Sequence, residues 1–536
     1  MEKPNIIVIL VDDMGYSDLG SYGGEVRTPN LDRLAANGLR FTQSYNSARC
    51  CPSRASLLTG LYSHQAGIAN FTGPDRTEEL GPAYLGRLNN NCATLAEVLT
   101  TAGYRTYGVG KWHVGDELDP TTRGFDEYYG FVKGHSAPQW EQQHYHRLPE
   151  SRVAELSYSN ENYFATEAFN DYAVEFLNQA TDDTDEDDAP WFLYLAHSAP
   201  HFPLHAPTET RDSYLDIYRC GWDILREERY QRQKESGLAT DTWAFTERSL
   251  IPIEEDNNIA NGYSGKQNPA WDELPADRQE DLTYRMAVFA AMIEHIDRGV
   301  GRIIDLLEEK GQLDNTLIIF TSDNGACYEW GPFGFDEFSR KGVTHLHQGE
   351  ELQKVGGPGT YHSVGSGWSC LSNTPLRMYK HYNHEGGNCS PFLAHWPDGI
   401  RQPDRWIRDP IHLFDIMPTL CEIAGAEYPE TMKGEAIHPQ EGVSLTPTFQ
   451  GENLPSRTLC FDHFEASAIR KGKWKLLRGN SRYPNQNWEL YDMAQDRCET
   501  TNLAKEHPDH VKTLAQEWNE WAIRVKVHPY FLEHHD

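Results

Sequence analysis

The stretch NIIVILVDD, residues 5–13, indicates the fold class of this 536-residue chain. Its apolar run is typical of a strand that is buried on both faces, as in a parallel sheet. Further buried strands are predicted in APWFLYLAHSAPH (189–201) and DNTLIIFTSDNG (314–325), and CATLAEVLTTAGYRTYGVG (92–110) predicts a helix followed by a strand. With a long helix at 281–310, this alternation predicts an α/β fold with a large, mostly parallel sheet flanked by helices.

The length and the C-terminal pattern indicate two domains. A chain of 536 residues is too long for one compact core. Short amphipathic strands are predicted in ASAIRKGKWKLLRG (466–479) and WELYDMAQD (488–496), and a helix over 507–525. We therefore predict an α/β domain over 1–440 and a smaller α+β domain over 441–536, with a short antiparallel sheet and a terminal helix.

Two long segments, 204–280 and 328–372, interrupt the alternation of strands and helices. The first is polar and is expected to be irregular, and the second is rich in Gly and His. Insertions of this kind over one face of a sheet commonly carry substrate contacts. THLHQGEE (344–351) places His345 and His347 in the second segment, where a solvated loop is favoured over a second metal site.

The composition argues against several classes of partner. A net charge of −32 disfavours nucleic acid and anionic membranes. It also requires a local basic pocket for any anionic substrate. No apolar run reaches the length of a membrane span, and the N-terminal run lacks the basic region and cleavage site of a signal peptide. We expect a cytoplasmic protein, or a periplasmic one if a signal peptide has been removed.

Polar side chains stand where the predicted strands end. The carboxyl ends of parallel strands meet at one edge of a sheet, and ligands bind there in open α/β folds. The residues at or just after these strand ends are Asp12, Asp13, Lys111, His113, His201, Asp323 and Asn324. The carboxylate and amide oxygens suit Ca²⁺ or Mg²⁺, and the cationic groups, with Arg54 and Lys380, suit a tetrahedral oxyanion. Taken singly, the acids could simply begin turns, the histidines could be ordinary core or loop residues, and Lys380 could lie on the surface. Their convergence at one edge of the sheet favours a binding site.

SARCCPSRASLLTG, residues 47–60, places Cys50 and Cys51 side by side at the start of a predicted helix, 53–59. Neighbouring cysteines do not easily bridge each other. A helix N-terminus and the nearby Arg54 would stabilise a thiolate at Cys50. A buried thiol and a disulfide to a distant cysteine are the alternatives that the residues leave open.

A set of short motifs occurs along the chain in this order: VDDMG (11–15), CCPSRASLLTG (50–60), GKWH (110–113), APH (199–201), SDNG (322–325) and NTPLRMYK (373–380). The set resembles the motifs of the sulfatase family, most closely the bacterial type I arylsulfatases, from about residue 4 to residue 500. The resemblance implies an alkaline-phosphatase-like fold and hydrolysis of sulfate monoesters of aryl alcohols or carbohydrates. It also implies one Ca²⁺ per chain and a formylglycine that a formylglycine-generating enzyme makes from Cys50.

The resemblance also implies roles for individual residues. Calcium would be held by Asp12, Asp13, Asp323, Asn324 and the modified Cys50. Arg54 would steady the formylglycine, and sulfate binding and proton transfer would fall to Lys111, His113, His201 and Lys380. One hydroxyl of the hydrated aldehyde would attack sulfur, and the other would then expel sulfate. His201 would protonate the leaving oxygen, and His113 would take the proton of the second hydroxyl.

Other functions share part of this pattern. A phosphonate monoester or phosphodiester hydrolase would use the same formylglycine site. A two-zinc phosphatase is disfavoured because the residues nominated for metal are oxygen ligands rather than histidines. A protein that only binds sulfated glycans would keep the cationic pocket and leave Cys50 as a thiol. The sequence does not distinguish an aryl from a sugar alcohol.

Overall fold

The computed structural model describes residues 3–528, apart from 153, 160–161, 182–188, 254–258, 337–344 and 433. Within these residues, ten strands form one mixed sheet in the order β10-β2-β8-β7-β1-β6-β3-β4-β5, with β9 beside β2. The strands are β1 (Asn5–Asp12), β2 (Leu39–Tyr45), β3 (Arg105–Lys111), β4 (Glu127–Phe131), β5 (His146–Leu148), β6 (Trp191–Pro200), β7 (Thr316–Ser322), β8 (Cys389–His395), β9 (Arg405–Ile407) and β10 (Ile411–His412). The strands around β1 are parallel, and β5 and β8 run antiparallel to their neighbours.

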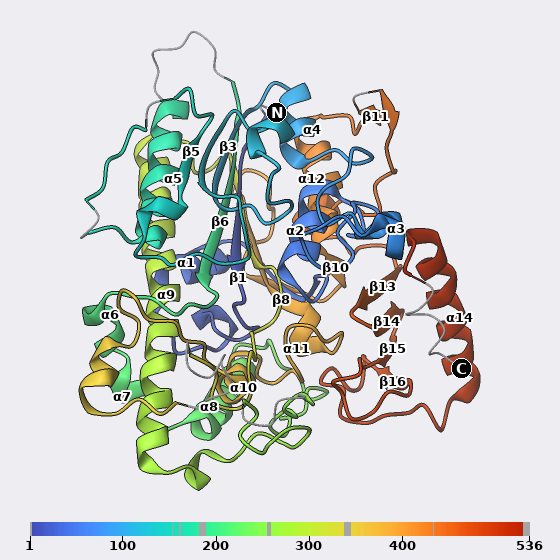
Figure 1. The fold of residues 1–536 in the computed structure, drawn as a ribbon. Helices are drawn as coiled ribbons and strands as arrows, with labels where there is room; N and C mark the ends of the chain where they lie inside the picture. The colour runs from blue at the N-terminus through green and yellow to red at the C-terminus, as the bar shows by residue number, and fades with distance from the viewer. Residues whose placement is uncertain are drawn as a thin grey trace.

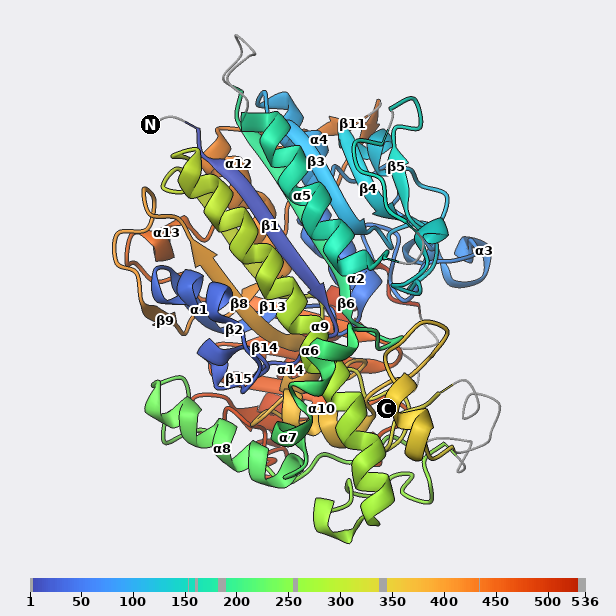
Figure 2. The same cartoon turned by 90° about the vertical axis from the view of Figure 1, so that its left-hand side faces the viewer.

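Helices cover both faces of this sheet (Figures 1 and 2). One layer contains α1 (Pro29–Ala36), α5 (Ala165–Thr181) and α9 (Ala276–Glu309), and the other contains α2 (Cys50–Thr59), α4 (Leu95–Thr101) and α12 (Ile416–Ala424). Alternate residues of β1 enter two different cores: Ile7, Ile9 and Val11 on the α5–α9 side, and Ile6, Val8 and Leu10 on the other. Because both faces are buried, the apolar run has no polar alternation. The predicted α/β fold is confirmed.

The C-terminal part forms a separate small sheet. Strands β13 (Thr458–His463), β14 (Ala466–Lys471), β15 (Trp474–Arg478) and β16 (Glu489–Asp492) pair antiparallel, and α14 (Pro508–Val525) packs on them. Figure 1 shows this unit beside the main sheet, on the side of α2 and α12. The smaller α+β unit is therefore present, with β13 as a strand that the sequence did not indicate. The limit at residue 440 stays a prediction.

The segment 204–280 is more regular than expected. It contains α6 (Thr208–Asp212), α7 (Leu215–Tyr218) and α8 (Trp222–Glu235), and the later insertion contains α10 (Ser366–Ser372). Figure 1 shows α8 and α10 beyond the end of the sheet opposite the N-terminus, which is the end where β1 stops. Shorter elements are α3 (Thr77–Leu80), α11 (Glu385–Asn388), α13 (Thr446–Phe449), β11 (Thr431–Met432) and β12 (Glu435–Ala436). Across the described ranges, we find no helix whose length and apolarity would let it cross a membrane.

Candidate active site

The ends of β1 and β7 bring three carboxylates together. Asp12 is the last residue of β1, and Asp323 follows β7 directly. The Asp323 amide donates to the Val11 carbonyl over 3.1 Å, which fixes the two strand ends side by side. One carboxylate oxygen each from Asp12, Asp13 and Asp323 lies within 4.8 Å of the others, and all three side chains are fully buried.

Two buried oxygens in this group have no hydrogen-bond donor. The Asn324 amide nitrogen donates to Asp13 Oδ1 over 2.6 Å and to the Gly325 carbonyl over 3.0 Å. Asn324 Oδ1 and Asp12 Oδ1 are both buried without a partner. Unpaired buried oxygens are costly, and a hard cation such as Ca²⁺ satisfies such a donor set. The residues at this position therefore fit the calcium ion that the sequence predicts.

A cation pairs with each of the three carboxylates. Lys111 Nζ donates to Asp12 Oδ2, Lys380 Nζ lies 2.9 Å from Asp13 Oδ1, and Arg54 Nε donates to Asp323 Oδ2 over 3.0 Å. Burial raises the pKa of the Asp323 carboxyl to about 7, and the charge of Asp12 adds to the shift. The basic groups therefore act as partners of the acids and do not form a free cationic ring.

Cys50 is the first residue of α2, which begins three residues before the predicted start. Its side chain is buried, and burial raises the pKa of the thiol despite the opposing charges of Lys111 and Lys380. The expected stabilisation of a thiolate is therefore wrong, because desolvation outweighs the nearby positive charges and Arg54 is engaged with Asp323. All ten cysteines lie in the described part of the chain as free thiols, which removes the disulfide alternative.

Two histidines stand beside this group. His113 follows β3 with a left-handed backbone (φ 52°), and within the part of the chain that the structure describes neither of its ring nitrogens has a hydrogen-bond partner. His201 follows β6, and its Nδ1 donates to the Phe202 carbonyl over 2.6 Å, which leaves Nε2 3.4 Å from Asp13 Oδ2. Burial lowers the pKa of both imidazoles, so both rings are neutral near pH 7. All the predicted site residues thus lie at one edge of the sheet, and their roles remain predictions.

Comparison with known proteins identifies the family. Residues 4–426 match the family model described as sulfatase, and residues 378–522 match the C-terminal model of N-sulphoglucosamine sulphohydrolase. The chain belongs to the sulfatase family. It is similar to an arylsulfatase of Klebsiella aerogenes, with 31% identity over 83% of this chain and 92% of that protein. Relatives of this kind identify it as a sulfatase enzyme.

Two further relatives have names that mention sugars. An N-acetylgalactosamine-6-O-sulfatase of Bacteroides thetaiotaomicron is 26% identical over 96% of this sulfatase and 92% of its own length. The crystal structure of Ps i-CgsB in complex with k-i-k-neocarrahexaose superposes with a TM-score of 0.65 and 25% identity, covering 97% of this chain and 93% of that one. Family membership and the fold are therefore supported along nearly the whole sulfatase chain.

A pocket of about 380 Å³ is lined by Arg49, the residue before Cys50, and by residues that the sequence did not single out. The Arg49 guanidinium, one residue before Cys50, stacks on Phe71 and Phe464 with centroid distances of 4.4 and 5.0 Å. The other lining residues are Tyr328, Glu329, Trp330, His381, Glu465, Asn480, Ser481 and Arg482. The pocket thus draws on the insertion, on the segment after Lys380 and on the C-terminal sheet. Only the place of Arg49 next to Cys50 is visible in the sequence.

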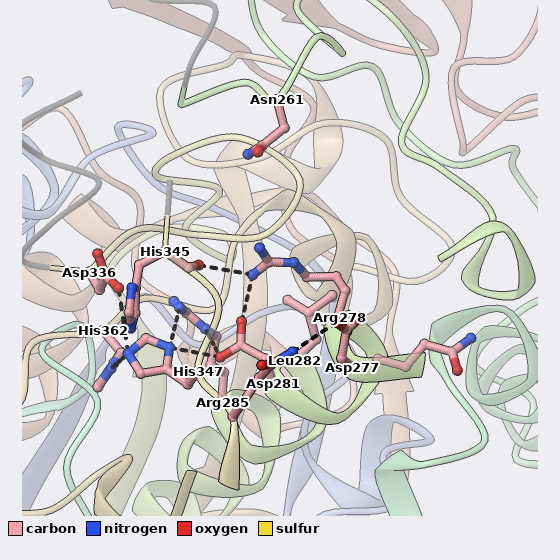
Figure 3. Close-up of polar contacts among 12 residues, drawn as sticks. Asn261, Asp277, Arg278, Asp281, Leu282, Arg285, Asp336, His345, His347 and His362 are labelled. Atoms are coloured by element: carbon pink, nitrogen blue, oxygen red, sulfur yellow. Dashed lines mark hydrogen bonds and ion pairs between the residues drawn. The ribbon is translucent and has the colours of Figure 1, made fainter. Parts of the chain in front are cut away.

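The prediction of a solvated loop around His345 and His347 is wrong. His347 is buried, and His345 is half-buried. His347 Nδ1 lies 2.9 Å from the buried carboxylate of Asp281 on α9, and Nε2 lies 3.1 Å from His362 Nε2 (Figure 3). The loop folds inward because α9 offers it a carboxylate partner.

Proposed function

We propose that this sulfatase hydrolyses sulfate monoesters through a formylglycine that is made from Cys50. The position of Cys50 carries the proposal: its buried side chain begins α2 next to the carboxylates of the strand ends and the ammonium groups of Lys111 and Lys380. A buried thiol with a raised pKa is a weak nucleophile at neutral pH. A modified side chain, made by a formylglycine-generating enzyme, would supply the aldehyde hydrate that attacks sulfur.

Asp12, Asp13, Asp323 and Asn324 would hold one Ca²⁺ in this site. The ion would neutralise charge on the transferring sulfate group and lower the pKa of a bound hydroxyl. The two buried oxygens without donors, Asp12 Oδ1 and Asn324 Oδ1, support this assignment. Arg54 fixes the Asp323 carboxylate and donates to the Lys111 carbonyl over 3.0 Å, so it orients two members of the site at once.

The remaining side chains would bind sulfate and move protons. Lys111 and Lys380 would stabilise the oxygens of the sulfate group as charge develops on them. His201 would protonate the leaving oxygen from Nε2, because its Nδ1 is engaged with the Phe202 carbonyl. His113 would accept a proton from the modified residue 50, since both of its buried ring nitrogens lack partners and its ring is neutral.

The pocket that Arg49 lines would bind the alcohol part of the substrate. Its aromatic walls, Trp330 and Phe464, suit the face of an aryl ring or of a sugar, and Arg49, Glu329 and Arg482 offer polar contacts. A volume of about 380 Å³ suits one ring more than a long chain. We therefore propose a compact aryl sulfate or a terminal sulfated sugar unit as the substrate.

The mass of the peptide that carries Cys50 tests this function. The protein should be produced in a host that contains a formylglycine-generating enzyme, and cut with a protease other than trypsin, since Arg49 and Arg54 flank the residue closely. We expect loss of sulfur and gain of oxygen at Cys50. An unmodified thiol in an active preparation would refute the formylglycine mechanism.

A matched pair of substrates distinguishes sulfate from phosphonate chemistry. The proposed function requires a higher kcat/KM for an aryl sulfate than for the aryl phosphonate monoester of the same phenol. The reverse order would assign the same site to a phosphonate hydrolase instead.

A further inference from the structure

A second cluster of metal-ligating side chains lies away from Cys50, in the insertion above α9. We name it the histidine cluster: Asp336, His345, His347 and His362 (Figure 3). His347 Nε2 is 3.1 Å from His362 Nε2 and 3.5 Å from Asp336 Oδ2. One ligand atom each from Asp336, His345 and His347 lies within 4.8 Å of the others. Two nitrogen ligands of a tetrahedral zinc ion, each about 2.05 Å from the metal, are separated by roughly 3.3 Å. The spacings from His347 Nε2 to His362 and to Asp336 therefore match those of zinc ligands. His362 adjoins the group of Asp336, His345 and His347 through its contact with His347.

Asp281 fixes the orientation of the central ligand. Its carboxylate lies 2.9 Å from His347 Nδ1, so His347 carries its proton on Nδ1 and turns the lone pair of Nε2 toward His362 and Asp336. Although burial opposes ionisation, Arg285 and His347 hold the pKa of Asp281 below its ordinary value. A carboxylate that hydrogen-bonds the distal nitrogen of a histidine is the usual support of a metal ligand.

His347 and His362 are the buried members of the cluster, and their Nε2 atoms face each other. His362 is 4% exposed, and its Nδ1 has no hydrogen-bond partner among the described residues. Burial lowers the pKa of His362 well below the ordinary value, so its ring is neutral. The ring planes of His345 and His362 stand at 84° and 72° to that of His347, so the rings meet edge to face and do not stack.

Arginine and carboxylate side chains in similar number surround the histidine cluster. Two arginines of α9 approach it: Arg278 pairs with Asp281 over 2.7 Å, and Arg285 lies 3.4 Å from the same carboxylate and 3.5 Å from His347 Nδ1. Asp281 and Asp336 offset them, and a third carboxylate, that of Glu351, lies 3.5 Å from His345 Nε2. A donor set of three imidazoles and one carboxylate selects zinc over calcium, because calcium prefers oxygen ligands.

We propose that Asp336, His345, His347 and His362 bind one zinc ion that fastens the insertion to α9. Four protein ligands close the coordination sphere, so the ion is structural and takes no part in sulfate transfer. The proposal does not depend on formylglycine at Cys50.

The contacts around the cluster show what the ion would brace. Arg285 Nη1 donates to the Phe335 carbonyl over 2.9 Å and to the Ser363 carbonyl over 3.0 Å, each next to a proposed ligand. The Phe335 ring packs on Phe202 with a centroid distance of 4.9 Å, and the Phe202 carbonyl accepts the hydrogen bond from His201. The zinc site would thus stabilise Phe335, which packs on Phe202 next to His201.

Metal analysis of the full chain tests the proposal. The protein is stripped with a chelator, returned to millimolar calcium to fill the carboxylate site, and dialysed against micromolar zinc. We expect one zinc per chain. Cobalt in place of zinc should give the intense visible absorption of a tetrahedral site, and this readout does not depend on sulfatase activity. A wild-type chain that binds no zinc and shows no such band overturns the proposal.

Three variants locate the ion. His347→Gln and His362→Gln should each lose the cobalt band and the bound zinc. Asp281→Asn keeps all four ligands and should weaken zinc binding about 10–100-fold. His395→Gln removes another buried histidine, 5% exposed and outside the cluster, and should bind zinc as the wild type does. Unchanged zinc binding in His347→Gln overturns the proposal, and so does a loss of zinc in His395→Gln equal to that in His347→Gln. If His347→Gln does not fold, the cobalt spectrum of the wild type decides.

Discussion

Replacing His201 by alanine should slow the cleavage of poor leaving groups far more than that of good ones. His201 is 3% exposed, and its Nδ1 is committed to the Phe202 carbonyl. Nε2 is therefore the only ring nitrogen that can give a proton to the leaving oxygen. Because burial lowers the pKa of this imidazole, Nε2 must take up a proton from solvent when the substrate binds, and the negative charge of the sulfate group favours the resulting imidazolium.

The size of the effect follows from the role of the proton. General acid catalysis contributes about 10²–10⁴-fold, which corresponds to about 3–5 kcal/mol of transition-state free energy. An alkyl or sugar sulfate needs this proton in full, because an alkoxide leaves poorly. A nitrophenyl sulfate releases a stable phenolate, so its kcat/KM should fall less than about 10-fold.

The assay compares kcat/KM of wild type and His201→Ala on these two substrates at the same pH. The ratio of the two losses is insensitive to a partly unfolded preparation, since inactive protein lowers both rates equally. His135→Ala serves as a control because its ring lies 6.0 Å from that of His201 and it has no assigned proton-transfer role. Equal losses on both substrates in His201→Ala would refute the assignment of His201 as the acid.

Three further substitutions test other parts of the structure. Cys50→Ala should abolish aryl sulfate hydrolysis while the melting temperature stays near that of wild type, and retained turnover would contradict the nucleophile. Lys380→Met should lower kcat about 10²–10³-fold in steady-state assays. Glu385→Gln leaves the buried Arg497 without its carboxylate, whereas Lys475 keeps Glu499 at 2.8 Å, and should cost about 3–5 kcal/mol in urea unfolding. Although burial opposes it, Arg497 and Lys475 lower the pKa of Glu385 from 4.5 to about 2. Its contribution to stability is therefore complete above the ordinary pKa and is lost as the pH falls toward 2, so the wild type should lose more stability over that range than Glu385→Gln.

Much of the carboxylate site could be predicted because it follows from one topological rule. Buried parallel strands read as uninterrupted apolar runs, and their carboxyl ends meet at one edge. Asp12, Lys111, His201 and Asp323 therefore came together without any knowledge of tertiary contacts. Lys380 could be placed only through the motif that contains it, since it follows no predicted strand.

The sequence failed where a buried polar group depends on a distant partner. Helix α8 looked irregular because its inward face carries Arg229, whose guanidinium lies 2.7 Å from Asp18 Oδ1 near the N-terminus. His347 looked exposed because its partner Asp281 is 66 positions away. The pKa of Cys50 was misjudged because the helix N-terminus is visible in the sequence, whereas the loss of water around the thiol is not.

The charge balance of the site explains how so acidic a protein would capture an anion. Lys111, Lys380 and Arg54 are matched by the carboxylates of Asp12, Asp13 and Asp323, and the neighbouring histidines are neutral. Since the pKa of Asp323 is raised to about 7, the side chains alone sum to between zero and +1 near neutral pH, against a net charge of −32 for the whole chain. A calcium ion on the carboxylates would make the site positive and free the ammonium groups to face sulfate. Calcium removal should then weaken the binding of inorganic sulfate as well as lower kcat, as measured by competitive inhibition at graded free calcium. Sulfate inhibition that stays constant while kcat falls would contradict this balance, because the ion would then serve the chemical step alone.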